Sequence, residues 1–85
     1  MLIEFAGIIG GFLGVILFIP QIIKTFKTKS VNDLSYHTWL LIYMNVLFWL
    51  LYGVVKNDYI IIIPNSIAVF LTTLMLVFFR IYRKI

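Results

Sequence analysis

Charged residues divide this sequence into three apolar stretches, at residues 2–23, 34–55 and 59–79. Each is close to the roughly 20 apolar residues that a helix needs to cross a hydrocarbon core of about 30 Å. A mean hydropathy of +1.12 and a charged fraction of 12% leave too little polar surface for a soluble domain of 85 residues. The sequence therefore predicts an all-α integral membrane protein, a single three-helix transmembrane domain over residues 1–85. We expect its helices at about 2–26, 34–55 and 59–80.

The polar residues argue against several classes of function. The chain has one His, no Cys and three carboxylates, all near predicted helix ends, which supply no acid–base pair, nucleophile set or metal cluster. The first stretch carries Glu4 and lacks the basic start and cleavage site of a signal peptide, so we expect it to be retained. We expect no enzyme, no cofactor, no metal site and no nucleic-acid partner.

The charges also predict an orientation. One side of the predicted bundle carries the basic residues Lys24, Lys27, Lys29, Arg80, Arg83 and Lys84. The other side carries only Glu4, Lys56 and Asp58. Because cytoplasmic ends are enriched in Lys and Arg, we expect the first loop and the C-terminus in the cytoplasm and the N-terminus outside, in the cell inner membrane.

Two prolines, each followed by a side-chain amide, lie within the apolar stretches. Pro20 precedes Gln21, and Pro64 precedes Asn65. A proline inside a helix cannot donate its backbone hydrogen bond and clashes with the carbonyl four residues earlier, so the helix bends or loosens there. These two sites are predicted hinges.

Glycines mark one face of the first helix. They form two overlapping small-xxx-small pairs, Gly7 with Gly11 and Gly10 with Gly14. In lipid this pattern lets another helix backbone approach closely, and helix packing is the simpler interpretation of these residues. The same face continues through Phe18 to Gln21.

A candidate substrate site follows from depth. Trp49 and Asn65 are at similar distances from the short turn after Val55, and at 1.5 Å per residue both lie roughly 9 Å inside their helix ends. An amide beside a flat aromatic ring suits a neutral polyol with apolar ring faces. We predict that Trp49 and Asn65 bind substrate, with Asn45 as a secondary contact one turn from Trp49. Since three helices cannot surround a solute path, a second copy is expected.

Together these motifs resemble the bacterial SemiSWEET sugar transporters, which belong with the SWEET and PQ-loop proteins. Phe18-Ile19-Pro20-Gln21 closes the first helix, Trp49-Leu50-Leu51-Tyr52-Gly53 closes the second, and Pro64-Asn65 lies early in the third. The resemblance covers essentially the whole chain.

The resemblance implies a parallel two-fold homodimer of six helices around a central sugar path, with Trp49 and Asn65 of both protomers at the substrate. It implies a hinge and inner gate at Phe18, Pro20 and Gln21. It also implies an outer gate made by Tyr52, Lys56 and Asp58. Relatives are expected to carry Arg where this chain has Lys56. The two-hydrogen-bond contact of Arg with a carboxylate is therefore replaced here by the single point charge of Lys.

The leading hypothesis is a passive uniporter for a small neutral mono- or disaccharide that works by alternating access. No carboxylate lies near mid-depth to relay protons. The alternative is a small pore-forming or structural membrane protein, such as a holin-like assembly or a helper subunit. The placement of Trp49 and Asn65 at the same depth, together with the helix-breaking prolines, favours the carrier. Its expected partners are a neutral sugar, membrane lipid and a second copy of itself.

Overall fold

Three long helices make up the computed structural model, which describes residues 2–82. They are α1 (Leu2–Thr28), α2 (Tyr36–Lys56) and α3 (Tyr59–Tyr82). Each is long and apolar enough to cross a membrane, and the prediction of an all-α, three-helix fold is confirmed. The helices α1 and α3 continue slightly beyond their predicted ends, whereas α2 begins slightly later than predicted.

Polar side chains and one left-handed residue fix where α2 begins and ends and where α3 begins. The Ser35 hydroxyl caps α2 by accepting a hydrogen bond from the first turn. Asn57 adopts a left-handed conformation with φ 56° and donates its backbone N–H to the Gly53 carbonyl, which ends α2. Asp58 then caps α3, its Oδ1 accepting from the Ile60 N–H at 3.0 Å. This turn holds α2 and α3 together as an antiparallel pair.

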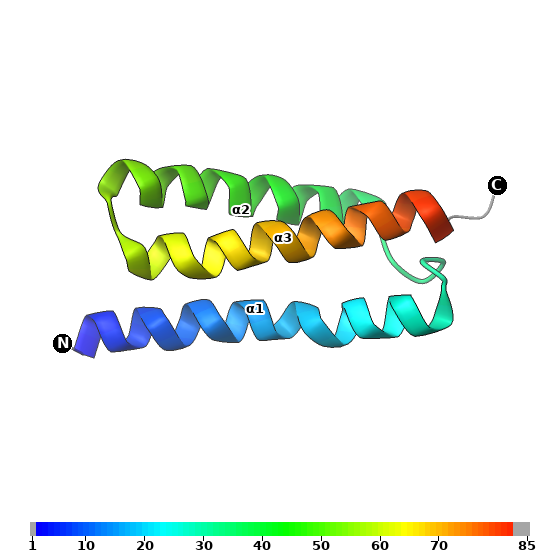
Figure 1. Cartoon of the computed structure of the whole chain (residues 1–85), viewed down its shortest axis with the longest axis horizontal. Coiled ribbons are helices and arrows are strands. Elements are labelled where there is room, and N and C mark those ends of the chain that lie inside the picture. Colours follow the sequence, from blue (N-terminus) through cyan, green and yellow to red (C-terminus); the bar gives the residue numbers. More distant parts are fainter. Residues whose placement is uncertain (1, 83–85) are drawn as a thin grey trace.

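The helices are arranged in space in the order α1, α3, α2, with α3 in the middle (Figure 1). The backbone of α3 lies next to both other helices, whereas α1 and α2 share no Cα–Cα distance of 8 Å or less. The bundle is accordingly flat, with principal extents of 49 × 22 × 15 Å. A gap between the backbones of α1 and α2 therefore runs along one side of α3, and side chains such as Phe18 and Trp39 fill part of it.

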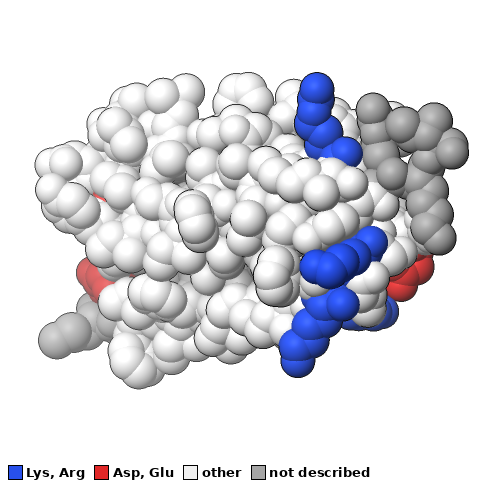
Figure 2. Space-filling view, turned by 45° about the vertical axis from the view of Figure 1, so that its right-hand side comes forward, with Lys and Arg blue, Asp and Glu red and all other residues white. Residues whose placement is uncertain are grey.

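The apolar core is concentrated at the end of the bundle where the lysines and arginines gather (Figure 2). Its largest cluster consists of Ile22, Val31, Trp39, Met75, Phe78 and Phe79. A smaller cluster of Val15, Val46 and Ala68 lies further along. The bundle is therefore tightly packed at this basic end, and more loosely packed toward the start of α1.

Neither proline ends its helix. The helix α1 runs unbroken through Pro20 to Thr28, and α3 runs through Pro64. Pro64 is buried, and its Cγ lies 2.8 Å from the position that a Cβ on Gly11 would take. The loosening predicted at the prolines is thus not a break in either helix, and their hinge role stays a prediction.

Candidate functional site

Trp49 and Asn65 line one cavity in the gap between α1 and α2. The cavity has a volume of ≈ 520 Å³. Its lining residues are Gly7, Gly10, Gly11, Trp49, Ile60, Ile61, Pro64 and Asn65. The structure therefore brings the two predicted binding residues together, one from α2 and one from α3. None of the lining side chains is charged, so the cavity suits a neutral molecule.

Asn65 also borders a second cavity of ≈ 240 Å³ that lies nearer the basic end. This cavity is lined in addition by Asn45 of α2 and by Phe18 of α1. It too lacks a charged side chain. The predicted secondary contact, Asn45, thus shares a cavity with Asn65, and Asn65 stands where the two cavities meet.

The Asn65 amide is anchored on one side only. Its Nδ2 donates to the Ile61 carbonyl of the preceding turn at 2.9 Å, and the residue is half-buried. Within residues 2–82, its side-chain oxygen has no hydrogen-bond partner. An anchored amide that keeps a free acceptor and a second N–H can accept from one hydroxyl of a neutral ligand and donate to another.

The four glycines of α1 divide into two kinds. A Cβ at Gly7 would lie 3.0 Å from Ile60 Cγ2, and one at Gly11 would lie 2.8 Å from the Pro64 ring, so this pair packs against α3. Nothing lies within 4 Å of a Cβ built on Gly10 or Gly14. Gly7 and Gly11 therefore pack as the pattern predicts, whereas no helix of this protomer packs against Gly10 and Gly14, which border the cavities.

Aromatic and basic side chains continue from Trp49 toward the end of α2. The Trp49 and Tyr52 rings meet edge to face, with centroids 5.6 Å apart and planes at 84°. The Lys56 ammonium lies 5.9 Å from the centre of the Tyr52 ring. Asp58 is turned into its capping bond, and among the described residues Lys56 and Asp58 form no ion pair with each other. The predicted outer-gate residues therefore gather at one end of the bundle.

Phe18 lines both the ≈ 240 Å³ cavity, called the central cavity below, and a third cavity at the basic end. This third cavity, of ≈ 360 Å³, is lined by Phe18, Gln21 and Trp39, among others. The Phe18 and Trp39 rings lie 5.5 Å apart and bridge the gap between α1 and α2. Sequence reasoning missed Trp39 as part of this constriction. No sequence signal reveals which residue of α2 lies opposite Phe18, because the loop of residues 29–35 does not fix how α2 is placed against α1.

Asp58, Asn65 and Thr72 recur every seven residues along α3 but do not form one continuous polar path. Asp58 caps the helix and Asn65 faces the cavities, but Thr72 is fully buried and donates its hydroxyl proton to the Ala68 carbonyl at 2.7 Å. Residues 2–82 hold no group of three or more His, Cys, Asp or Glu side chains that could bind a metal. The chemistry of the gap is thus that of amides, aromatic rings and open glycine backbone.

Comparisons with known proteins point in one direction. The profile of the family described as "Sugar efflux transporter for intercellular exchange" matches residues 3–85. The sugar transporter SemiSWEET of Leptospira biflexa is 30% identical over 70 residues, which are 82% of this chain and 82% of that protein. A crystal structure of a bacterial homologue of SWEET transporters superimposes with a TM-score of 0.90 at 30% identity, covering 98% of this chain and 100% of that one. The crystal structure of SemiSWEET in the inward-open conformation superimposes with a TM-score of 0.80 at 29% identity, covering 93% of this chain and 85% of that one.

Proposed function

This chain belongs to the family of sugar efflux transporters for intercellular exchange, and from that premise we propose that it carries a small neutral mono- or disaccharide passively across the membrane by alternating access. The observation that carries the proposal is the uncharged cavity shared by Trp49 and Asn65. The family membership supports this carrier and gives no support to the pore-forming or structural alternative.

Substrate binding rests on complementary surfaces. The Trp49 side chain, about half of which is exposed, offers an apolar plate for a sugar ring face. The free oxygen and second N–H of Asn65 serve the hydroxyls, with Asn45 contributing from the adjoining cavity. A carrier must release what it binds, so we expect an affinity near 1 mM, or about −4 kcal/mol.

The binding site is completed by a second copy of the chain. One protomer lines the gap on α1, α2 and α3 but leaves it uncovered on the remaining side. A parallel partner related by a two-fold axis would face its own gap toward the first, so that both Trp49 and both Asn65 surround one sugar. The complete path would then have six helices.

Access alternates between the two ends of this path. At the basic end, Phe18 and Trp39 meet across the gap beside Pro20 and Gln21, and separating them would open the site inward. At the other end, Tyr52, Lys56 and Asp58 would close against the partner subunit. The positive-inside rule assigns the basic end to the cytoplasm and the N-terminus to the outside of the cell inner membrane.

Alanine substitutions at the binding residues test the proposal. Deleting one net hydrogen bond costs about 0.5–1.5 kcal/mol, which brings a millimolar affinity close to the limit of detection. Asn65→Ala and Trp49→Ala should therefore nearly abolish sugar binding and uptake, and Asn45→Ala should lower both to a smaller extent. The measurements are calorimetric titration with sugar and uptake of radiolabelled sugars into liposomes.

Asn32→Ala is the matched control, because Asn32 is an exposed loop amide that lines none of these cavities. It should bind and transport as the parent protein does. Full uptake by both Asn65→Ala and Trp49→Ala, with dimers correctly inserted, would place the substrate elsewhere.

A further inference from the structure

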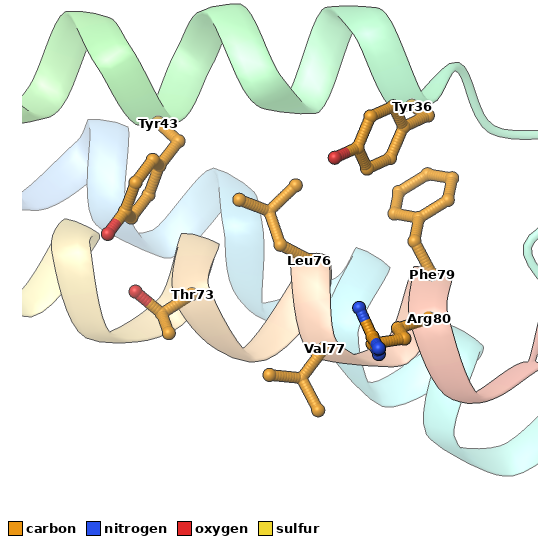
Figure 3. Close-up of a pocket in the computed structure, with 7 residues that line it drawn as sticks. All are labelled: Tyr36, Tyr43, Thr73, Leu76, Val77, Phe79 and Arg80. Atoms are coloured by element: carbon orange, nitrogen blue, oxygen red, sulfur yellow. The ribbon is translucent and has the colours of Figure 1, made fainter.

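A separate groove lies between α2 and α3 near the basic end of the bundle (Figure 3). It has a volume of ≈ 500 Å³. Its walls include Tyr36 and Tyr43 from α2 and Thr73, Leu76, Val77 and Arg80 from α3. The Tyr36 ring packs edge to face on Phe79, with centroids 5.5 Å apart, at the same end as Arg80. Arg80 therefore lies at one end of the groove and the Tyr43 and Thr73 hydroxyls at the other, with the apolar side chains of Leu76 and Val77 between them (Figure 3).

The groove faces away from the sugar cavities. Tyr43 and Asn45 are two residues apart on α2, which at 3.6 residues per turn places them about 200° apart around the helix. Asn45 borders the central cavity, so Tyr43 and the groove lie on the opposite face of α2. A dimer that pairs through the gap between α1 and α2 therefore leaves the groove in contact with lipid.

Charge and shape identify what fits there. We propose that this groove binds one anionic phospholipid, with the Arg80 guanidinium on the phosphate and an acyl chain along Leu76 and Val77. Arg80 is exposed, and within the described part of the chain it forms no ion pair. A guanidinium pairs well with phosphate oxygens through two parallel hydrogen bonds. Basic pockets between membrane helices are suited to such headgroups.

Two hydroxyls give the groove further polar contacts. Figure 3 shows the Tyr36 and Tyr43 hydroxyls directed from α2 into the groove, with the Thr73 hydroxyl facing Tyr43. Thr73 donates to the Val69 carbonyl at 2.7 Å, so the tyrosines are the donors open to a lipid oxygen. Seven residues separate Thr73 from Arg80, or roughly 10 Å along the helix, which is enough to hold a glycerol group and the start of a chain.

The surrounding charge favours a net negative headgroup. No acidic side chain lines the groove, and most of the lysines and arginines gather at the same end of the bundle (Figure 2), although Lys24 there is paired with Asp33. The ammonium of a zwitterionic choline headgroup would bring another cation beside Arg80. Phosphatidylglycerol brings only the phosphate charge, so it is the better match.

Native mass spectrometry of the purified protein with equal amounts of phosphatidylglycerol and phosphatidylcholine tests the proposal. The parent protein should retain phosphatidylglycerol in preference, up to one molecule per protomer. Arg80→Gln should lower that retention about fivefold, since one basic residue near a membrane surface contributes about 1 kcal/mol. Val77→Trp, which fills the groove without changing charge, should lower it as well.

Lys27→Gln is the matched control, because it removes a charge from the basic end but does not line the groove. This variant should retain as much phosphatidylglycerol as the parent protein does. Equal losses in Lys27→Gln and Arg80→Gln would show bulk surface attraction in place of a site. Equal retention of phosphatidylcholine would overturn the headgroup assignment, and displacement of the lipid by millimolar inorganic phosphate would indicate a phosphate-ion site.

Discussion

Gly10 and Gly11 are chain neighbours with opposite surroundings. A methyl group at Gly11 would meet the rigid Pro64 ring at 2.8 Å and 3.1 Å, whereas one at Gly10 would meet nothing within 4 Å. Gly11 is therefore required for α1 to approach α3, and Gly10 leaves space for a ligand. One helix face thus packs against α3 at Gly11 and borders the cavities at Gly10.

This difference predicts opposite effects of the same substitution. Alanine raises helix propensity by about 1 kcal/mol relative to glycine, but overpacking costs about 1–3 kcal/mol. Gly11→Ala should therefore lower the thermal unfolding temperature in detergent, while Gly10→Ala should leave it unchanged or raise it slightly. If Gly11→Ala unfolds at the same temperature as Gly10→Ala, α1 does not pack on α3 as described.

The depth of Trp49 and Asn65 could be predicted from the sequence because a short turn joins their helices. The turn fixes the register of α2 against α3, so counting residues from it places both side chains at one level. The Phe18–Trp39 contact could not be predicted in this way, because the longer loop between α1 and α2 does not fix the register of one helix against the other. Likewise, no pattern in the sequence distinguishes Gly11 from Gly10 before the position of Pro64 is known.

The element least held by its neighbours is α1. In an apolar 18-residue segment of α1 only 6% of the residues are buried, whereas in the corresponding segment of α3 22% are buried. The backbone of α1 lies next to α3 alone. The order α1, α3, α2 was not predicted, because lipid and protein interior are both apolar and hydrophobicity does not reveal which helices pair. A weakly held helix with an internal proline is suited to rocking against a fixed pair.

Replacement of Pro20 tests whether α1 moves in this way. Pro20→Ala restores a backbone donor for the Ile16 carbonyl and removes the ring clash, so α1 should become stiffer. We expect sugar exchange in liposomes to fall several-fold while the unfolding temperature is kept or raised.

Ile19→Ala is the control for this test, because Ile19 is an exposed neighbour whose replacement does not alter the backbone bonding. It should exchange sugar at nearly the parent rate. Unchanged exchange in Pro20→Ala would remove the proline from the mechanism and leave the motion of α1 to its contacts with α3.

At the scale of the whole molecule, one protomer forms only part of the wall around its cavities. The cavities of ≈ 520 Å³ and ≈ 240 Å³ lie in the same gap, and α1, α2 and α3 together cover only part of it. The need for a second copy could be inferred from the sequence, since three helices cannot surround a path. Which face pairs could not, because that depends on where the gap between α1 and α2 lies.

The face used for pairing can be tested with single cysteines, since the chain has none of its own. Tyr52 lies on the same side of α2 as Trp49, whereas Val54, two residues on, lies about 200° around the helix. In a parallel dimer closed around the gap, Tyr52 of one protomer approaches Tyr52 of the partner subunit near the two-fold axis. Tyr52→Cys should therefore form an intermolecular disulfide when membranes are oxidised, giving a band of twice the mass on a non-reducing gel.

Val54→Cys is the matched control at nearly the same depth, and it should remain monomeric on the same gel. Because Val54 is exposed near the turn that joins α2 to α3, its thiol should also react with a membrane-impermeant maleimide added outside intact cells, as the proposed orientation requires. Cross-linking at Val54 without cross-linking at Tyr52 would mean that protomers pair through the groove face. In that case the two cavities bordered by Asn65 would face lipid, and the proposal of a shared binding site would be wrong.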